Sequence, residues 1–299
     1  MKPLQRLLAA ALLAGLAGTA QAQFGDLLRQ LPIPGAGNIL NTPAAPGGAA
    51  AAGDLLQMLA QSVDNIDEPR EIEIGRQLAA VLLGSKPLHS DANLQRYVNR
   101  LGRWLSLQSE RPHLPWTFGV LDDAGFNAFA APGGYIFVTK GLVDRVDEAE
   151  LAGILAHEIT HVTARHHLKA LAAKARSGIA TQLIASQVRS NIVGNAISAQ
   201  MLALGRDLYT SGLDRADEHD ADRQGVTLAA RAGFDPYGLP SVLQQLRTAA
   251  PDNPLFTLTL STHPPAQQRL EVLEAAMGNR LDALSGKPSV PIATRLRAR

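Results

Sequence analysis

Apolar residues recur at every third or fourth position in several stretches of the chain, which is typical of helices with one buried face. This pattern predicts helices over residues 67–83, 91–107, 151–167 and 213–233. Acidic residues stand at the start of the helix predicted at 151–167, where negative charge stabilises the helix dipole. An alanine-rich stretch at 168–206 also has an apolar face and predicts further helix.

Strand signals occur only in the middle of the chain. Residues 116–121, 126–130 and 135–139 are short runs rich in aromatic or β-branched side chains, and a Pro132-Gly133-Gly134 turn precedes the last of them. The pattern therefore predicts a helical protein built around one small β region.

The first residues have the layout of a secretory signal peptide. Lys2 and Arg6 precede an apolar run over residues 7–17, and Ala20-Gln21-Ala22 follows as a small-x-small cleavage site. The alternative is a buried N-terminal helix, but a core helix needs neither the basic start nor the small-residue end. We expect residues 1–22 to be removed on export, and the sequence predicts a periplasmic location.

The flanks differ in composition from the middle. Residues 23–53 are rich in Pro, Gly and Ala and predict a flexible linker, and one folded domain is expected over residues 54–278. Residues 279–299 end in Arg295, Arg297 and Arg299 and predict a basic, disordered tail.

The composition excludes some classes of binding partner and all chemistry that needs cysteine. Without residues 1–22 the chain has 277 residues (299 minus 22), with 26 basic residues (28 less Lys2 and Arg6) against 27 acidic ones. This balance gives no reason to expect nucleic acid as a partner. Cysteine is absent, which excludes disulfides, thiolate metal ligands and a lipidated cysteine. The 16 uncharged residues between Arg189 and Arg206 are too few and too polar to predict a transmembrane helix, although they leave peripheral membrane contact or a lid as alternatives.

The candidate chemistry begins with His157, Glu158 and His161, an H-E-x-x-H motif on the helix predicted at 151–167. Two histidines four residues apart lie on one helix face, so both imidazoles can reach one metal ion. Glu158 stands where it could polarise a water at that metal. The alternative is a surface helix that holds two histidines by chance, and a catalytic zinc site would need a third protein ligand.

Two candidates for the third ligand compete. His166 and His167 follow the motif, but the metzincin pattern with that spacing needs glycine where this chain has Ala164, which we expect to continue the helix and carry His167 away. Glu218 and Asp222 share one face of the helix predicted at 213–233. One carboxylate could bind zinc while the other accepts an N–H from a metal-bound histidine. The alternative for this pair is a solvated cluster of charges.

Together, H-E-I-T-H at 157–161 and E-H-D-A-D-R-Q-G at 218–225 resemble the zinc metallopeptidase family of HtpX and the CAAX prenyl proteases. Three further segments match that family: N-A-F-A at 127–130, G-F-D-P at 233–236, and S-T-H-P at 261–264 with Arg269 six residues past His263. The resemblance covers about residues 67–276. It is nearest to the exported branch of the family, the periplasmic β-barrel assembly-enhancing proteases.

The resemblance implies a zincin-like, mainly α, α+β domain with a small sheet over two metal-binding helices. It implies one zinc ion per chain, held by His157, His161 and Glu218, with Glu158 as the catalytic base. His263 should approach the metal, either as a donor to the oxyanion or as a fourth ligand that keeps the enzyme latent, and we favour latency. Arg269 should hold that loop by pairing with an acidic neighbour, and Asp222 should orient a ligand histidine.

Two departures limit the resemblance. HtpX and the prenyl proteases span the membrane many times, whereas this chain predicts no mature span, so a prenylated substrate is not implied. The assembly-enhancing proteases carry tetratricopeptide repeats, and no repeat of that period is present here. The role of such repeats in docking partners is therefore not carried over.

The sequence thus predicts a zinc endopeptidase acting on unfolded or misassembled envelope and outer-membrane proteins, with the outer-membrane assembly machinery as a candidate partner. The alternatives are a periplasmic chaperone with a structural or regulatory zinc, and a zinc amidase acting on cell-wall material. For substrate binding we expect Asn127 and the strand of Tyr135, Ile136, Phe137 and Val138, as an edge that pairs with a peptide backbone. The alternative is a sheet that only covers the core.

Overall fold

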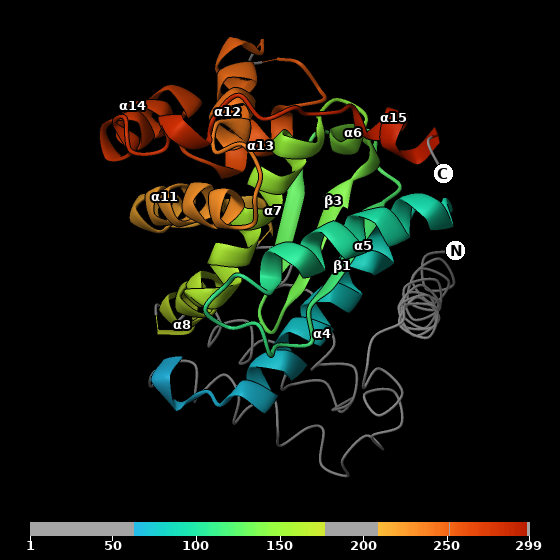
Figure 1. The fold of residues 1–299 in the computed structure, drawn as a ribbon. Coiled ribbons are helices and arrows are strands. Elements are labelled where there is room, and N and C mark those ends of the chain that lie inside the picture. The colour runs from blue at the N-terminus through green and yellow to red at the C-terminus, as the bar shows by residue number, and fades with distance from the viewer. Residues whose placement is uncertain (1–62, 177–208, 251, 298–299) are drawn as a thin grey trace, which may run out of the picture.

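The computed structural model describes residues 63–176, 209–250 and 252–297, coloured in Figure 1. The predicted signal peptide, the predicted linker and the 177–206 part of the alanine-rich stretch lie outside the described residues. The predicted fold class is confirmed, because helices surround a single small sheet. None of the described helices combines the length and the apolar character that a bilayer span requires.

The sheet has three strands, β1 (Thr117–Leu121), β2 (Ala128–Ala131) and β3 (Tyr135–Thr139), in the order β1-β3-β2. β3 runs parallel to β1 and antiparallel to β2. The prediction that β3 is a substrate-binding edge is therefore wrong, because its backbone is bonded to a strand on each side. Among the described residues, β2 is the strand with an open edge on the side of α7 (Glu148–Thr163), the helix that carries His157 and His161.

Both faces of the sheet are covered. Side chains alternate along β3, so that Ile136 and Val138 enter one apolar cluster while Tyr135 and Phe137 enter another. The first cluster includes side chains of α5 (Ala92–Ser106) and α7, and the second includes side chains of α4 (Glu68–Ser85) and α8 (His166–Arg176). Burial on both faces explains why the strand reads YIFVT without polar alternation.

Local sequence fixes the start of α7. Asp147 and Glu150 form a capping box, in which the Asp147 carboxylate accepts from the Glu150 N–H while the Glu150 carboxylate accepts from the Asp147 N–H. The short helix α6 (Lys140–Val143) precedes this cap and follows β3 directly.

The end of α7 differs from the prediction. The helix stops at Thr163 with Ala164 as its C-cap, and Arg165 has a φ of 59°, in the left-handed region that a non-glycine side chain rarely adopts. The chain turns there and restarts as α8 at His166. The expectation that Ala164 continues the helix and carries His167 away is wrong, because a non-glycine residue makes the turn that we assigned to glycine alone.

Glycines allow two helices to approach α7 closely. A side chain at Gly225 of α11 (Arg215–Arg231) would place its Cβ 2.9 Å from the Cα of His157. At Gly153 of α7, a Cβ would lie 2.7 Å from the backbone nitrogen of Leu239 in α12 (Gly238–Thr248). Since Gly225 is three residues past Asp222 and seven past Glu218, this contact turns both carboxylates towards His157.

The C-terminal elements return to α7. α13 (Thr257–Thr262) and α14 (Ala266–Met277) are followed by short turns at η2 (Asp282–Leu284) and α15 (Ile292–Arg297). Glu148 donates its N–H to the carbonyl of Val290, and Ile292 is buried in the main core. The predicted disorder of the tail is thus wrong for residues 279–297, which fold onto α5 and the start of α7.

Candidate metal centre

Two histidines of α7 form the first part of the site. His157 and His161 are buried one helical turn apart, and their Nε2 atoms lie 3.0 Å from each other. Burial and the surrounding imidazoles hold the pKa of His161 well below its usual value, so this ring is neutral and ready to bind a cation. The helix therefore presents two nitrogen donors to one point.

Glu218 of α11 brings a third donor to the same point. Its Oε1 lies 3.6 Å from Nε2 of His161, and its Oε2 lies 3.8 Å from Nε2 of His157. Tetrahedral ligands at zinc bond lengths of about 2.0–2.1 Å stand roughly 3.3 Å apart, so the three residues fit such an ion. Oε2 of Glu218 is buried and has no hydrogen-bond partner. Nη1 of Arg269 lies 3.7 Å from this oxygen, beyond hydrogen-bond distance, so Oε2 keeps a lone pair that a cation could bind.

The far side of His157 is held by an acid and an arginine. Oδ1 of Asp222 lies 3.0 Å from Nδ1 of His157. Arg269 of α14 donates to both oxygens of Asp222, at 2.9 and 2.6 Å. Asp222 is the acidic neighbour of Arg269 that the sequence left unnamed. Burial raises the pKa of Asp222, but Arg269 and His157 together outweigh burial and hold that pKa far below its usual range.

Asp222 also acts on His157 itself. Burial lowers the pKa of His157, but the bond to Asp222 and the charges of Asp222 and Glu218 together outweigh burial and leave that pKa raised. The raised pKa favours the protonated ring, so a metal ion at His157 would compete with a proton.

The far side of His161 is held by a residue that sequence reasoning considered only as a ligand. Nδ1 of His166 lies 2.9 Å from Nδ1 of His161, and Nε2 of His166 lies 3.4 Å from Oδ1 of Asp217 on α11. His166 therefore stands behind His161 as Asp222 stands behind His157. The only sequence signal for this role is the His166-His167 doublet, and the turn at Arg165 that creates the contact has no such signal.

Glu158 lies between the metal-binding atoms and two hollows. A nitrogen of His157, a carboxylate oxygen of Glu158 and a nitrogen of His263 all lie within 4.8 Å of one another. Burial raises the pKa of Glu158 to about 7, and the nearby charge of Glu218 adds to the rise. A carboxyl group with this pKa can both take and give a proton near neutral pH.

His263 follows α13 and turns its ring towards the same point. Its Nδ1 lies 3.2 Å from the carbonyl of Thr259 and 3.0 Å from Oγ1 of Thr262, which already donates its own hydrogen to Leu258. Both neighbours accept at Nδ1, so this bonding pattern assigns the proton to Nδ1. Nε2, which lies 4.0 Å from Oε2 of Glu218, is then an unprotonated donor atom.

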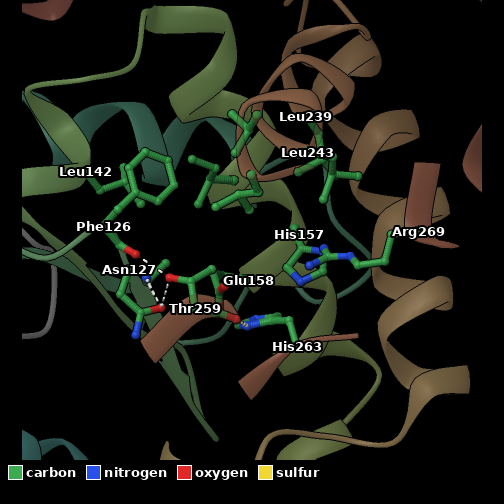
Figure 2. A pocket seen from close by; sticks show the side chains of 14 residues that line it. Phe126, Asn127, Leu142, His157, Glu158, Leu239, Leu243, Thr259, His263 and Arg269 are labelled. Carbon is green, nitrogen blue, oxygen red and sulfur yellow. Dashed lines mark hydrogen bonds between the residues drawn. The ribbon is translucent and has the colours of Figure 1, made fainter. Parts of the chain in front are cut away.

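Two hollows open beside Glu158. Figure 2 shows the first, in which Phe126 and Leu142 face Leu239 and Leu243 across an open space bordered by Glu158 and His157. Asn127 and Thr259 lie at its lower edge, where the Thr259 hydroxyl bonds to the carbonyl of Phe126 and lies 3.3 Å from the Asn127 side chain. The second hollow is lined by more polar residues, among them His161, His167, Tyr209 and Glu218. Tyr209 Oη and His167 Nδ1 are buried there without a hydrogen-bond partner among the described residues.

The structure brings together most of the residues predicted to form the site. His157, Glu158, His161, Glu218, Asp222, His263 and Arg269 surround one point, and Asn127 borders both hollows. Tyr135, Ile136, Phe137 and Val138 do not belong to it, because β3 is central and these side chains are buried in the two clusters.

Comparisons with known proteins agree with this geometry. The model of Peptidase family M48 matches residues 89–277. The β-barrel assembly-enhancing protease of Escherichia coli (strain K12) is 32% identical over 232 residues, which cover 76% of this chain and 47% of that relative. The protease HtpX homolog of Salinibacter ruber is 28% identical over 182 residues, 51% of this chain and 64% of the relative. The mitochondrial metalloendopeptidase OMA1 of Schizosaccharomyces pombe is 29% identical over 192 residues, 64% of this chain and 55% of the relative. The chain spans about half the length of the assembly-enhancing proteases that it matches.

Proposed function

The chain belongs to Peptidase family M48, and from that premise we propose that it is a zinc-dependent endopeptidase of the periplasm. Its proposed substrates are unfolded or misassembled envelope and outer-membrane proteins, and the outer-membrane assembly machinery is its proposed partner. The relatives named β-barrel assembly-enhancing protease support this assignment. The predicted signal peptide supports the location.

The observation that carries the proposal is the orphaned Oε2 of Glu218 beside two histidine nitrogens. His157, His161 and Glu218 would hold one zinc ion per chain, with Glu158 beside His157. Zinc bound there would polarise a peptide carbonyl and acidify a water molecule. Asp222 and His166 would fix the two imidazoles with Nε2 towards the ion.

Glu158 performs the proton transfers in this proposal. It takes a proton from the attacking water and passes it to the amine that leaves as the peptide bond breaks. A purely structural zinc site needs no general base, so a buried Glu158 with a raised pKa favours hydrolysis over a chaperone with a structural metal.

The substrate backbone would pair with β2 rather than with β3. The outer edge of β2 has no partner among the described residues, and Ala128 lines both hollows. Asn127, at the start of this edge, also borders both hollows and would contact the peptide there. Pairing through backbone bonds holds a peptide of any sequence, as a protease of misassembled proteins requires.

His263 would keep the enzyme latent. Because its Nδ1 carries the proton, Nε2 offers a lone pair that can bind zinc but no hydrogen for an oxyanion. Burial lowers the pKa of His263, which keeps the ring neutral and suited to a ligand. We expect His263→Ala to raise turnover, because it removes the fourth ligand that blocks the water site, whereas unaltered turnover and zinc affinity would eliminate both roles. A fall in turnover by roughly a hundred- to a thousandfold would instead assign His263 as an oxyanion donor.

The central test incubates unfolded outer-membrane proteins with the zinc-loaded full chain and with Glu158→Gln. We expect fragments with the wild type and turnover lower by at least about a hundredfold with Glu158→Gln. Equal suppression of aggregation by both proteins, without fragments, would favour the chaperone alternative. Release of soluble products from cell-wall material, again without protein fragments, would favour the amidase.

A further inference from the structure

We propose that the outer face of α5 docks on an anionic phospholipid bilayer, through a patch of aromatic, aliphatic and cationic side chains. This patch, the Trp104 surface, consists of Arg103, Trp104, Leu107, Arg231 and Lys287. Figure 1 shows α5 on the outside of the molecule, and the helix packs on β1 and α7. The inference goes beyond the proposed function and does not depend on peptidase activity.

Two large apolar side chains at the end of α5 face solvent. Trp104 is 52% exposed and Leu107 is 51% exposed, whereas Leu101 and Leu105 are buried in the core. The indole N–H of Trp104 donates to the carbonyl of Ala232 at 2.9 Å. The ring could therefore leave water for the headgroup region of a bilayer without losing a bond of its only donor, and tryptophan is enriched at that depth.

Cationic side chains lie beside the exposed ring. Nζ of Lys287 donates to the carbonyl of Gly233 at 2.9 Å, next in the chain to the carbonyl that Trp104 bonds. Nη1 of Arg231 donates to the carbonyl of Gln108 at 3.0 Å, at the end of α5. Three separate segments of the chain thus bring aromatic and cationic groups to one surface.

The charge of this surface is not balanced by carboxylates. Arg103, Arg231 and Lys287 form no ion pair within the described part of the chain, and the two printed side-chain bonds end on neutral carbonyl oxygens. α5 itself has no acidic residue from Ala92 to Ser106. A surface with this charge attracts an anionic partner, and each Lys or Arg close to an anionic bilayer strengthens binding.

Shape and charge favour a bilayer over another protein. Neither of the two hollows beside Glu158 includes a residue of the Trp104 surface, so those hollows offer no place there for an anchoring side chain of a partner. A second copy of this chain would bring the same three cations against one another. Anionic headgroups, in contrast, can meet the cations while the apolar groups enter the interface.

Docking through α5 is compatible with the proposed path of the substrate. α5 packs on β1, and β3 separates β1 from β2. The contact therefore does not use the open edge of β2, with which the peptide would pair.

Vesicle co-sedimentation tests the proposal. The full chain is incubated with vesicles of phosphatidylcholine alone and with vesicles in which phosphatidylglycerol replaces part of that lipid. We expect partitioning onto the anionic vesicles to be stronger by at least about tenfold and to fall as salt is added. Equal partitioning onto both kinds of vesicle, or binding to neither, would overturn the proposal.

Tryptophan fluorescence locates the contact. The chain has two tryptophans, and Trp116 is fully buried. Brominated phospholipids quench a tryptophan that enters the bilayer, so they should quench Trp104 in the bound wild type, and Trp104→Phe should lose this quenching. Binding to anionic vesicles without quenching of Trp104 would place the contact elsewhere in the chain and overturn the assignment.

Matched variants separate this surface from net charge. Arg103→Gln with Arg231→Gln should lower partitioning onto anionic vesicles by at least about tenfold, since each cation near the bilayer contributes about fivefold. Arg145→Gln with Arg247→Gln is the control, because it removes the same charge from two exposed side chains that also bond only to neutral oxygens. Equal losses in the two double variants would overturn the proposal.

Discussion

Two buried glutamates with arginine partners invite comparison, because only one of them belongs to the site. Glu71 on α4 accepts from Arg111 at 2.8 Å and from the backbone of Gly133 at 3.2 Å, and its other oxygen lies 3.1 Å from Arg165. Nη1 of Arg269 lies 3.7 Å from Oε2 of Glu218, and this oxygen accepts no hydrogen bond. Burial of a charged group is therefore no sign of function by itself. The feature that indicates a metal site is a carboxylate oxygen that accepts no hydrogen bond and lies beside two histidine nitrogens.

The two clusters also differ in what they hold together. The Glu71 cluster joins α4 to the turn before β3 and to Arg165 at the corner between α7 and α8. That corner places His166 behind His161. The cluster around Glu71 therefore supports the site around Glu218 structurally. We expect substitution of Glu71 to lower stability and substitution of Glu218 to lower zinc binding.

The largest expected difference is between the two glutamates themselves. The double substitution of Glu218→Ala and His161→Ala should reduce bound zinc from one ion per chain to none, because two of the three proposed ligands are lost. Glu71→Ala should keep the zinc ion but lower the free energy of unfolding by about 3 kcal/mol, since it leaves a broken buried ion pair. Elemental analysis and urea denaturation measure the two quantities. Wild-type protein without zinc under metal-replete conditions would contradict the proposed site.

The metal-free stability of Glu218→Ala sharpens the same comparison. Removing a carboxylate that has an orphaned oxygen should change the free energy of unfolding of the metal-free protein by less than about 1 kcal/mol. A loss as large as that of Glu71→Ala would mean that the centre is held together by its own charges.

Glu158 predicts a pH dependence of the metal-free protein. Its pKa rises from 4.5 to about 7 on folding, so the buried group stays protonated at a pH where the unfolded chain has lost the proton. Its contribution to stability is fully present below about pH 4.5 and is lost as the pH rises to about 7. The wild type should therefore lose about 3 kcal/mol relative to Glu158→Gln across this interval. A constant difference in urea midpoints from pH 4.5 to 8 would contradict the raised pKa.

The smallest effects concern the residues behind the ligands. Asp222→Ala and His166→Ala should each weaken zinc binding by about ten- to a hundredfold, as loss of a ligand's supporting bond usually does. His167→Ala is a matched control for His166→Ala, because His167 is also buried but its Nδ1 bonds to nothing. Competition with a zinc chelator measures the affinities. Equal effects of the two substitutions would reduce His166 to a packing role.

Local sequence was enough for the starts of four helices and for the first two proposed ligands. The capping residues Asp67, Asp91, Asp147 and Asp214 start four helices where the apolar periodicity begins. His157 and His161 could be paired from their spacing alone, because four residues make about one helical turn. Glu218 was one of two candidate carboxylates by the same reasoning, and the family resemblance chose between them.

Tertiary structure decided the properties that depend on contacts distant in sequence. Strand order made β3 central and β2 the edge, and hydrophobic content could not show this because both faces of the sheet are buried. The left-handed turn at Arg165 brought His166 behind His161 although the local sequence favours continued helix. Periodicity along one element reports which of its faces is buried, whereas the partner of that face is fixed by packing among α7, α11 and α12. The proposed metal ligands could therefore be predicted largely from the sequence, whereas the residues behind them, the open edge of β2 and the apolar hollow beside Glu158 depend on the fold.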